Sequence, residues 1–316
     1  MNSIFSYSDM RDAFFEELFS IALLDKDVIL LMADQEAFSF KKFRTKIPKQ
    51  LINAGIAEQN MISVACGLAL CGKKVFVHAI SNFATLKSYE QIKVDLSFMN
   101  LPVTIVGVGA GFAYGSDGPT HHTNQDIGVM RAIPGIRILN ACDMVSLSNF
   151  PRIAYDDPNL TYIRFDKGSF PCVYSKDHDF KQGLSIISEG KDVCIVSTGI
   201  MIHSVIELKE KLKQKYNINP AIVDIYRLKP LNYNLLSRKI SHFKKIITIE
   251  EHISYGGLGT IVSDFICDMN LKVRFMRLGL ADTNCFVYGD RNYIQTKMNL
   301  GQSVLFKKIV EFLKTK

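Results

Sequence analysis

A carboxylate at the start of an apolar segment is the first feature of the sequence that could do chemistry. Glu58 lies in GIAEQNM (residues 55–61), directly before the small-residue run SVACGLAL. A glutamate in the first turn of a helix is ordinarily a charge that the helix dipole favours. A glutamate among buried apolar residues is instead poorly solvated, which raises its pKa and suits it to proton exchange. The local sequence leaves both interpretations open.

A second candidate feature is the turn DGPTHH, in which Asp117 precedes His121 and His122, with Asp126 nearby. Adjacent histidines in a loop usually face solvent, and as metal ligands these lack a third partner at a recognisable spacing. We therefore expect no metal site on this chain. The glycines at 107–111 lack the G-x-G-x-x-G spacing of a dinucleotide loop, so we expect a turn at a strand end there.

Composition limits the class of protein. The chain has 316 residues, is 47% hydrophobic and 22% charged, and carries a net charge of +7. This length predicts two domains, and no apolar run approaches the roughly 18 to 20 residues of a membrane span. Lysines are dispersed rather than interleaved with aromatic residues, so neither nucleic acid nor a membrane is an expected partner. We expect a cytoplasmic protein whose seven widely spaced cysteines are buried free thiols.

Short β-branched segments that alternate with stretches of helical period predict an α/β fold. These segments are residues 27–34, 73–80, 101–109 and 136–139 in the first half, and 192–199, 219–226, 244–251 and 271–279 in the second. Strands that alternate with helices form mainly parallel sheets covered on both faces. We therefore predict two three-layer α/β/α domains, at 1–175 and 191–316, joined by a polar linker at 176–190.

The order of the motifs closely resembles the transketolase family of thiamine diphosphate enzymes. GIAEQ, NFA followed by YEQI, DGPTHH-x-x-x-D-I and MRAIPG resemble the family's pyrimidine-binding domain. IITIEEHISYGGLGTIVSD resembles its C-terminal domain. The resemblance covers nearly the whole chain. It implies a thiamine diphosphate-dependent transketolase, which transfers a two-carbon ketol unit from a ketose donor to an aldose acceptor.

The family's diphosphate and magnesium motif, Gly-Asp-Gly followed by an asparagine, is missing from this chain. The Gly-Asp pair at 289–290 lies close to the C-terminus and is followed by Arg291. The resemblance therefore implies the C-terminal subunit of a split transketolase, whose N-terminal subunit is a separate chain that binds the diphosphate and Mg²⁺. It also implies a symmetric heterotetramer within which this chain forms a homodimer.

The resemblance assigns cofactor contacts to five residues. Glu58 matches the glutamate that hydrogen-bonds a ring nitrogen of the cofactor's aminopyrimidine and shares a proton with it. Phe83 matches the aromatic residue that packs on this ring. Ile80 lies where many relatives have a second aromatic residue. Asp34 falls on a loop that lines the cofactor cleft, and Tyr89 belongs to the YEQI motif.

Substrate contacts are implied for Asp117, His121, His122, Arg11 and Lys167. His121 would move protons to and from the sugar, and Asp117 would bond a hydroxyl of the donor, whereas His122 is less clearly placed. Arg11 matches one member of the family's phosphate-binding cluster, and Lys167 replaces an arginine.

Other members of this phosphate-binding cluster are altered. Gly109 replaces a histidine, and Phe38 occupies a serine position with Ser39 beside it. Lysine is a point charge rather than a bidentate fork, so Lys167 would bind phosphate differently from an arginine. We therefore expect a sugar or sugar phosphate as substrate, with at least one substrate that is not a standard pentose phosphate.

Three other functions remain open. The chain could be the β subunit of the E1 component of a 2-oxo-acid dehydrogenase, or resemble 1-deoxyxylulose-5-phosphate synthase. It could also be a non-catalytic assembly subunit, in which the Glu58 site should be broken. For His252 and the Gly256-Gly257 turn we expect a packing role in the dimer rather than a place in the active site.

Overall fold

The computed structural model describes residues 9–314, and the chain divides into two compact units. Unit 1 contains the residues up to Ala110 together with Val129–His178. Unit 2 contains Gly111–Gly128 and the residues from Asp179 onwards. Segment 111–128, which carries the DGPTHH turn, therefore belongs to unit 2, although the residues on both sides of it belong to unit 1.

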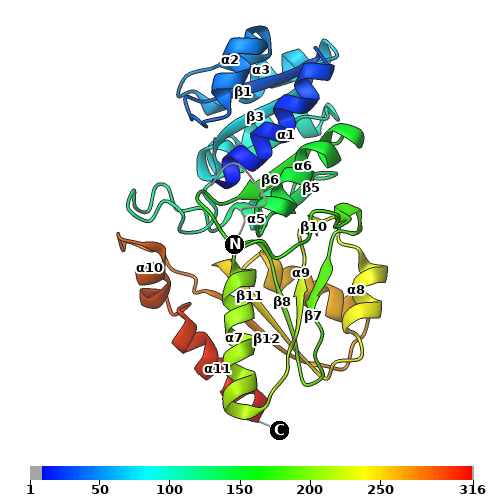
Figure 1. Ribbon diagram of the computed structural model, residues 1–316, viewed down its shortest axis with the longest axis vertical. Helices are drawn as coiled ribbons and strands as arrows, with labels where there is room; N and C mark the ends of the chain where they lie inside the picture. The colour runs from blue at the N-terminus through cyan, green and yellow to red at the C-terminus, as the bar shows by residue number, and fades with distance from the viewer. Residues whose placement is uncertain (1–8, 315–316) are drawn as a thin grey trace. The chain divides into compact units, whose positions relative to one another are not determined.

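Unit 1 contains parallel strands in the order β5-β6-β4-β3-β1-β2 (Figure 1). Strands β1, β4, β5 and β6 are buried along their whole length, as is typical of a parallel sheet covered on both faces. The strands are β1 (Val28–Met32), β2 (Leu51–Asn53), β3 (Lys74–Ile80), β4 (Thr104–Val108), β5 (Arg137–Asn140) and β6 (Thr161–Phe165).

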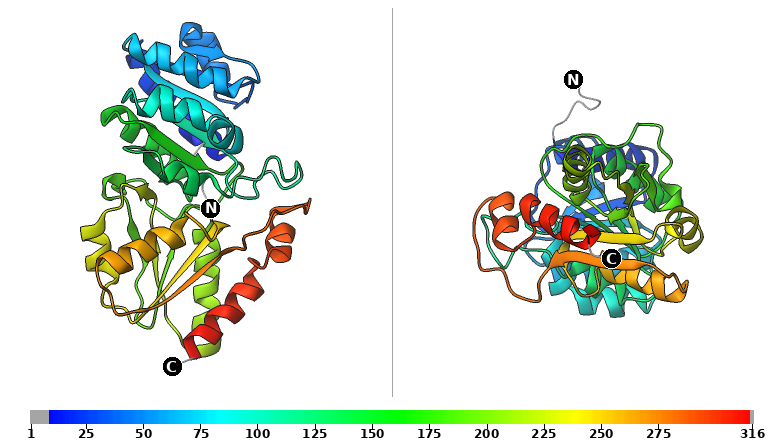
Figure 2. Two further views of the ribbon diagram at one scale, coloured as in Figure 1. Left: turned by 180° about the vertical axis from the view of Figure 1, so that it is seen from behind. Right: turned by 90° about the horizontal axis from the view of Figure 1, so that it is seen from below.

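The helices of unit 1 cover the two faces of this sheet. Helices α1 and α6 pack against each other on one face, and α3 packs with the π-helical turns η2 and η3 on the other (Figures 1 and 2). The helical elements are α1 (Met10–Leu24), α2 (Phe40–Lys46), η1 (Pro48–Gln50), α3 (Glu58–Leu70), η2 (Phe83–Lys87), α4 (Tyr89–Gln91), η3 (Ile92–Ser97) and α6 (Met144–Asp156), and the division of the chain into units falls within α5 (Asp126–Arg131).

Unit 2 has a sheet with the strand order β12-β11-β8-β9-β7, parallel except for β7, which is antiparallel to β9. Helix α7 packs against β8, β9 and β11, and α9 against β11 and β12. The elements are η4 (Phe180–Gln182), β7 (Ser185–Ser188), β8 (Cys194–Ser197), α7 (Met201–Tyr216), β9 (Ala221–Asp224), β10 (Arg227–Lys229), α8 (Tyr233–Ile240), β11 (Lys245–Ile253), α9 (Leu258–Asp268), β12 (Arg274–Leu280), α10 (Arg291–Lys297) and α11 (Gln302–Lys314).

The predicted α/β class with mainly parallel sheets is confirmed, and every predicted strand segment contains a strand. The sequence did not predict β2, β6, β7 and β10. Strands β2 and β10 have three residues each, which is too short for a periodic signal. The segment 176–190, expected as a linker, contains η4 and the edge strand β7.

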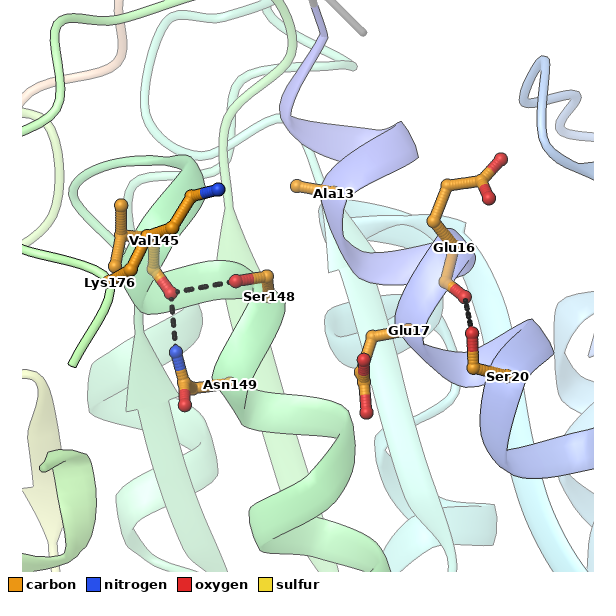
Figure 3. Close-up of a pocket in the computed structure, with 8 residues that line it drawn as sticks. All are labelled: Ala13, Glu16, Glu17, Ser20, Val145, Ser148, Asn149 and Lys176. Carbon is orange, nitrogen blue, oxygen red and sulfur yellow. Dashed lines mark hydrogen bonds between the residues drawn. The ribbon is translucent and has the colours of Figure 1, made fainter. Parts of the chain in front are cut away.

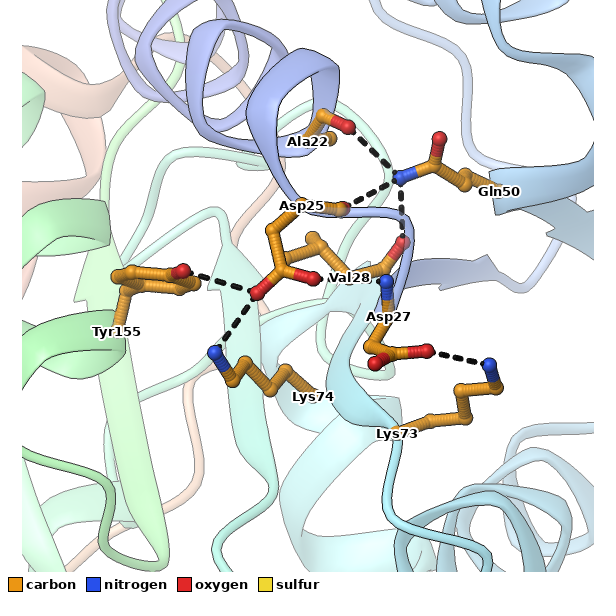
Figure 4. Close-up of polar contacts among 8 residues, drawn as sticks. All are labelled: Ala22, Asp25, Asp27, Val28, Gln50, Lys73, Lys74 and Tyr155. Carbon is orange, nitrogen blue, oxygen red and sulfur yellow. Dashed lines mark hydrogen bonds and ion pairs between the residues drawn. The ribbon is translucent and has the colours of Figure 1, made fainter.

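The side chains of Asp25 and Gln50 fasten the end of α1 to neighbouring elements of unit 1 (Figure 4). The Asp25 carboxylate accepts hydrogen bonds from Lys74 at 2.7 Å and from Tyr155 at 2.8 Å. The bond from Lys74 is the main cause that lowers the pKa of Asp25 to about 2. The side-chain amide of Gln50 donates to three backbone carbonyls between Ala22 and Val28. The bond to Ala22 satisfies a carbonyl that the end of α1 leaves open, and the bond to Val28 joins this end to the start of β1.

His78 is a buried histidine in the core of unit 1. Its side chain lies on β3, and its Nδ1 is 3.0 Å from the carbonyl oxygen of Val106. The ring packs edge-on against Phe15, with 4.7 Å between the ring centroids, and against Phe40 at 5.9 Å. Burial lowers the pKa of His78 to about 4. The neutral imidazole is therefore part of the folded structure at neutral pH.

The free energy of unfolding of unit 1 is expected to fall as the pH drops from about 6.5 to 4, by about 3 kcal/mol from His78 alone. In this range the unfolded chain takes up a proton at His78 and the folded chain does not, so acid favours the unfolded state. Chemical unfolding of the isolated subunit at a series of pH values measures the effect. His78→Phe should remove this contribution and His242→Gln, at an exposed histidine, should keep it. An unchanged pH dependence in His78→Phe would contradict the assignment.

Candidate active site

Four of the five predicted cofactor-binding residues of unit 1 lie at or just after the carboxyl ends of parallel strands. Asp34 follows β1, Glu58 follows β2, and Ile80 and Phe83 lie at the end of β3 and just beyond it. Because parallel strands point in the same direction, these segments share one edge of the sheet. Open α/β sheets ordinarily bind their ligands at this edge.

Glu58 is the first residue of α3 and is only 3% exposed. The chain turns into the helix through Gly55, which has a φ of +70°. The fully buried Met61 and Ile62 on the next turn of α3 hold the helix against the sheet. The carboxylate therefore lies where the sequence predicted it, at the buried start of an apolar helix.

The Glu58 carboxylate has a partner that the sequence analysis did not identify. Lys87, the last residue of η2, places its Nζ 2.7 Å from Glu58 Oε2. The glutamate side chain is 4% exposed and the lysine side chain 44% exposed, so a buried anion is neutralised by a cation that reaches solvent. The same ammonium lies 6.0 Å from the centroid of the Phe83 ring. Glu58 and Phe83 thus flank one common cation.

These residues fit the pyrimidine ring of thiamine diphosphate on structural grounds. A protonatable aromatic heterocycle needs an acceptor that can carry charge and an apolar face on which to stack. The buried Glu58 carboxylate supplies the first and the half-buried Phe83 ring the second. Ile80, also half-buried, completes the turn between β3 and η2. Tyr89, which is also half-buried, begins α4 two residues after the end of η2.

Asp34 has a structural role in the turn after β1. Its backbone N–H donates to Asn53 Oδ1 at 3.2 Å, and the Asn53 amide donates to Asp34 Oδ1 at 3.1 Å. The residue has a φ of 51°, which an aspartate tolerates better than most residues. This reciprocal pair joins the carboxyl ends of β1 and β2. Asp34 is therefore at the predicted edge, with its side chain engaged by Asn53.

The predicted phosphate contacts Arg11 and Lys167 lie on segments that Asp9 joins. The Asp9 carboxylate accepts from Arg11 Nε at 3.0 Å and from the backbone N–H of Gly168, next to Lys167, at 3.0 Å. Burial of Asp9 opposes its ionisation, but these bonds outweigh that effect and lower its pKa. The Asp9 carboxylate thus already neutralises part of the positive charge that would otherwise be available to bind a phosphate group.

Two other positions of this cluster differ in exposure. Phe38 is 80% exposed, so its ring is available at the surface. Ser39 is buried, and its hydroxyl donates to Asp12 at 2.8 Å. Ser39 therefore serves the packing of α1 and α2 rather than replacing the family's serine. Gly109 has a φ of 91° and donates its N–H to Phe165, which makes it part of the turn at the end of β4.

Segment 111–128 of unit 2 carries the predicted substrate residues. Gly111 and Thr123 exchange two backbone hydrogen bonds, of 2.7 and 2.8 Å, which close the segment into a loop. Asp117 is exposed and His121 half-buried, with its Nδ1 3.0 Å from the Thr120 hydroxyl. His122 is instead buried with its ring 5.0 Å from that of Phe112, and burial lowers its pKa. His122 thus packs inside the loop.

Two successive residues of β11 fasten the ends of this loop. The backbone N–H of Phe112 donates to Glu251 Oε2 at 3.0 Å, and that of Gly128 donates to His252 Nε2 at 3.3 Å. Arg291 holds the Glu251 carboxylate from the other side, with its Nη2 2.8 Å from Oε2. A Cβ on Gly111, which has a φ of +55°, would lie 1.8 Å from Glu251 Oε2. These contacts give His252 a structural role within unit 2.

The Gly-Asp pair near the C-terminus has a structural use. Asp290 caps α10 by accepting from the backbone N–H of Tyr293 at 2.9 Å, and the following Arg291 makes the pair with Glu251. Within residues 9–314 no group of three or more His, Cys, Asp or Glu residues could hold a metal ion. In the same range no helix has the length and apolar character required to cross a membrane.

Two cavities, one in each unit, lie away from the candidate residues. One in unit 1, of about 320 Å³, lies between α1 and α6 (Figure 3), and one in unit 2, of about 440 Å³, between α7 and α11. In the first, Glu16 pairs with Lys42 and Glu17 with Arg152. Neither cavity is lined by a predicted site residue, so we assign the site from Glu58 and its neighbours rather than from cavity size.

Two models of known protein families together match most of the chain. Residues 6–172 match the transketolase pyrimidine binding domain, and residues 183–292 match the transketolase C-terminal domain. The chain belongs to the transketolase family. The segments that carried the resemblance in the sequence lie within these two matches.

Similar transketolase subunits align with this chain over nearly their whole length. The chain is 32% identical over 308 residues to one of the subunits of an apulose-4-phosphate transketolase from Phocaeicola vulgatus, covering 96% of this chain and 97% of the relative. It is 31% identical to a 6-deoxy-6-sulfo-D-fructose transketolase subunit of a Clostridium species, covering 92% and 90%. A solved split-gene transketolase, described as an inactive β4 tetramer, has a TM-score of 0.84 at 27% identity and covers 96% and 98%. The chain thus aligns with these transketolase subunits over nearly their whole length.

Proposed function

We propose that this chain and a separate diphosphate-binding subunit form a thiamine diphosphate-dependent transketolase that is active only as a complex. The observation that carries the proposal is the buried Glu58 carboxylate at the carboxyl edge of the sheet of unit 1, whose partner Lys87 also lies over the ring of Phe83. When bound, thiamine diphosphate supplies the nucleophilic carbon that accepts a two-carbon ketol unit from a ketose. The unit then passes to an aldose.

The side chains of this chain would bind, orient and move protons. Glu58 would hold a proton at the pyrimidine nitrogen, because a buried carboxylate exchanges it readily with an aromatic base. Phe83 would stack on the ring, a contact worth about 1 kcal/mol beyond the area it buries. His121 would exchange a proton with a sugar oxygen, and Asp117 would accept a hydrogen bond from a donor hydroxyl.

The partner subunit would bind the diphosphate and Mg²⁺. The missing Gly-Asp-Gly motif and the structural use of Asp290 and Arg291 support this division. The relatives named as subunits, and the β4 tetramer described as inactive, also support it. We infer a heterotetramer with two copies of each chain, in which the copies of this chain form a dimer.

At least one substrate is expected to differ from the standard pentose phosphates. Gly109 and the exposed Phe38 replace polar members of the family's phosphate cluster, and Asp9 already engages Arg11. Two similar subunits are named for apulose 4-phosphate and for 6-deoxy-6-sulfo-D-fructose, which are unusual ketoses. The substrate of this chain would belong to the same broad class of ketoses with an anionic group.

Purification of the chain together with its N-terminal subunit tests these proposals. The complex should bind thiamine diphosphate with Mg²⁺ and transfer a ketol unit, whereas each subunit alone should do neither. A panel of ketoses that includes xylulose 5-phosphate would identify the donor. Equal or better efficiency with xylulose 5-phosphate would contradict the expected substrate class. Decarboxylation of pyruvate without ketol transfer would instead favour a 2-oxo-acid dehydrogenase subunit or a 1-deoxyxylulose-5-phosphate synthase-like enzyme.

A further inference from the structure

The ion pair between Lys87 and Glu58 occupies the carboxylate on which the proposed function depends. Lys87 Nζ is 2.7 Å from Glu58 Oε2, which is the length of a strong charge-assisted hydrogen bond. The carboxylate is almost completely buried, whereas the lysine is nearly half exposed. The buried member of the pair therefore depends on its partner for neutralisation, while the ammonium can move into solvent at little cost.

The position of the ammonium matches the requirements of the cofactor's ring. It faces the Glu58 carboxylate and lies 6.0 Å from the centroid of Phe83, so a carboxylate oxygen and an aromatic residue both face one cation. A protonated heterocycle that bonds to Glu58 and stacks on Phe83 makes the same two kinds of contact. The ring and the ammonium therefore compete for the same carboxylate oxygen and for the same space.

We propose that Lys87 is a positioning residue that occupies the Glu58 carboxylate in the cofactor-free subunit and is displaced when the pyrimidine ring of thiamine diphosphate binds. This inference rests on the proposed function. It assigns Lys87 a role in cofactor loading rather than in sugar binding. The pair keeps the buried carboxylate neutralised and in place until the ring arrives.

The proposal predicts opposite effects of one substitution on two properties. Without Lys87 the carboxylate of the free subunit has lost its cation, so the folded free subunit is less stable. Binding of the ring no longer has to displace the ammonium, so cofactor affinity rises. If Lys87 had a purely structural role, its substitution would lower the stability of the free subunit, and the affinity for the cofactor would stay the same or fall. If Lys87 bound the sugar, its substitution would change the KM for the sugar and not the affinity for the cofactor.

The decisive experiment compares Lys87→Met with the unmodified chain, each assembled with the N-terminal subunit. Titration of the complex with thiamine diphosphate at saturating Mg²⁺ should give a Kd that is lower by about fivefold in the variant. Chemical unfolding of the isolated subunit should show a lower midpoint for the same variant. An unchanged or higher Kd in Lys87→Met overturns the inference.

Three further variants keep the test interpretable. Lys87→Arg retains the positive charge and should keep a Kd close to that of the unmodified chain. Lys87→Gln keeps a neutral donor and should shift the Kd in the same direction as Lys87→Met by a smaller factor, which provides a second measurement if the methionine variant folds poorly. Lys93→Met, at an exposed lysine of the next helical turn whose ammonium lies over Phe98, should change neither Kd nor unfolding midpoint.

The outcomes also separate the inference from the proposed function. If the unmodified complex binds no thiamine diphosphate, the proposed function fails and the inference fails with it. If the unmodified complex binds the cofactor and Lys87→Met binds it equally well, the proposed function stands and only the role of Lys87 is overturned.

Discussion

Replacement of Glu58 by glutamine is expected to lower the kcat of ketol transfer by about 10³-fold in the assembled complex. Glutamine has nearly the same size and keeps a hydrogen-bonding group at the start of α3. It cannot take up or release the proton that the proposed role requires. The measurement is steady-state ketol transfer with the donor that the panel of ketoses identifies.

The neighbouring residue provides a control for Glu58→Gln. Gln59 lies next to Glu58 on α3 but is exposed, so Gln59→Ala should retain activity within about twofold. Gel filtration should show that both variants still assemble with the N-terminal subunit. Full activity in Glu58→Gln would contradict the proposed chemistry and favour a non-catalytic assembly subunit.

Removal of the Glu251 carboxylate should cause the largest loss of stability in unit 2, about 3 to 5 kcal/mol for Glu251→Ala. The side chain is 4% exposed, and the Arg291 side chain that it neutralises is 18% exposed. Glu251 also accepts hydrogen bonds from the Phe112 backbone and from the Gln295 amide. Its loss leaves a nearly buried cation and several donors without their acceptor. Hydrogen exchange of the β11 and α10 amides in the free subunit measures the change within unit 2.

Matched variants distinguish loss of the buried ion pair from the effect on stability of removing any one carboxylate. Glu207→Ala removes a carboxylate of α7 that is 64% exposed and 3.9 Å from Lys211, and it should change stability by less than about 0.5 kcal/mol. The double variant Glu251→Ala, Arg291→Met should be more stable than Glu251→Ala alone, because it no longer buries an uncompensated charge. Equal stability of the single and the double variant would contradict this account.

The pKa of His122 provides an independent measurement of the Glu251 charge. Burial lowers the pKa of His122, and the negative charge of Glu251 opposes that shift. Glu251→Gln removes the charge, so an NMR titration should give a pKa for His122 that is lower still. The imidazole would then remain neutral to lower pH. An unchanged or higher pKa would show that the loop does not hold His122 near Glu251.

The sequence was sufficient to predict the fold class because the signals that define it are local. Each predicted strand segment, from DVILLMAD in β1 to LKVRFMRLG in β12, combines β-branched residues with a helical stretch on either side. Alternation of this kind requires a mainly parallel sheet with helices on both faces. The local sequence left the burial of Glu58 open, and the structure shows this side chain buried at the start of α3, beside the fully buried Met61 and Ile62.

The partners of the site residues could not be predicted in the same way. Lys87 lies 29 residues beyond Glu58, and a lysine in a short polar stretch is ordinarily a solvated charge. Glu251 lies 139 residues beyond Phe112, and His252 lies 124 residues beyond Gly128. Nothing in the spacing of these residues distinguishes them from other charged residues of the chain.

The amino-acid sequence by itself therefore predicted the family and the fold class, and it singled out Glu58 as the candidate carboxylate of the site. Only the tertiary structure decided that Lys87 neutralises this carboxylate and that β11 holds the loop with His121. The reason is physical. Periodicity and strand-end motifs depend on residues close together in the chain, whereas the pairing of a buried charge depends on which distant side chain the packed sheet and helices bring within hydrogen-bonding distance.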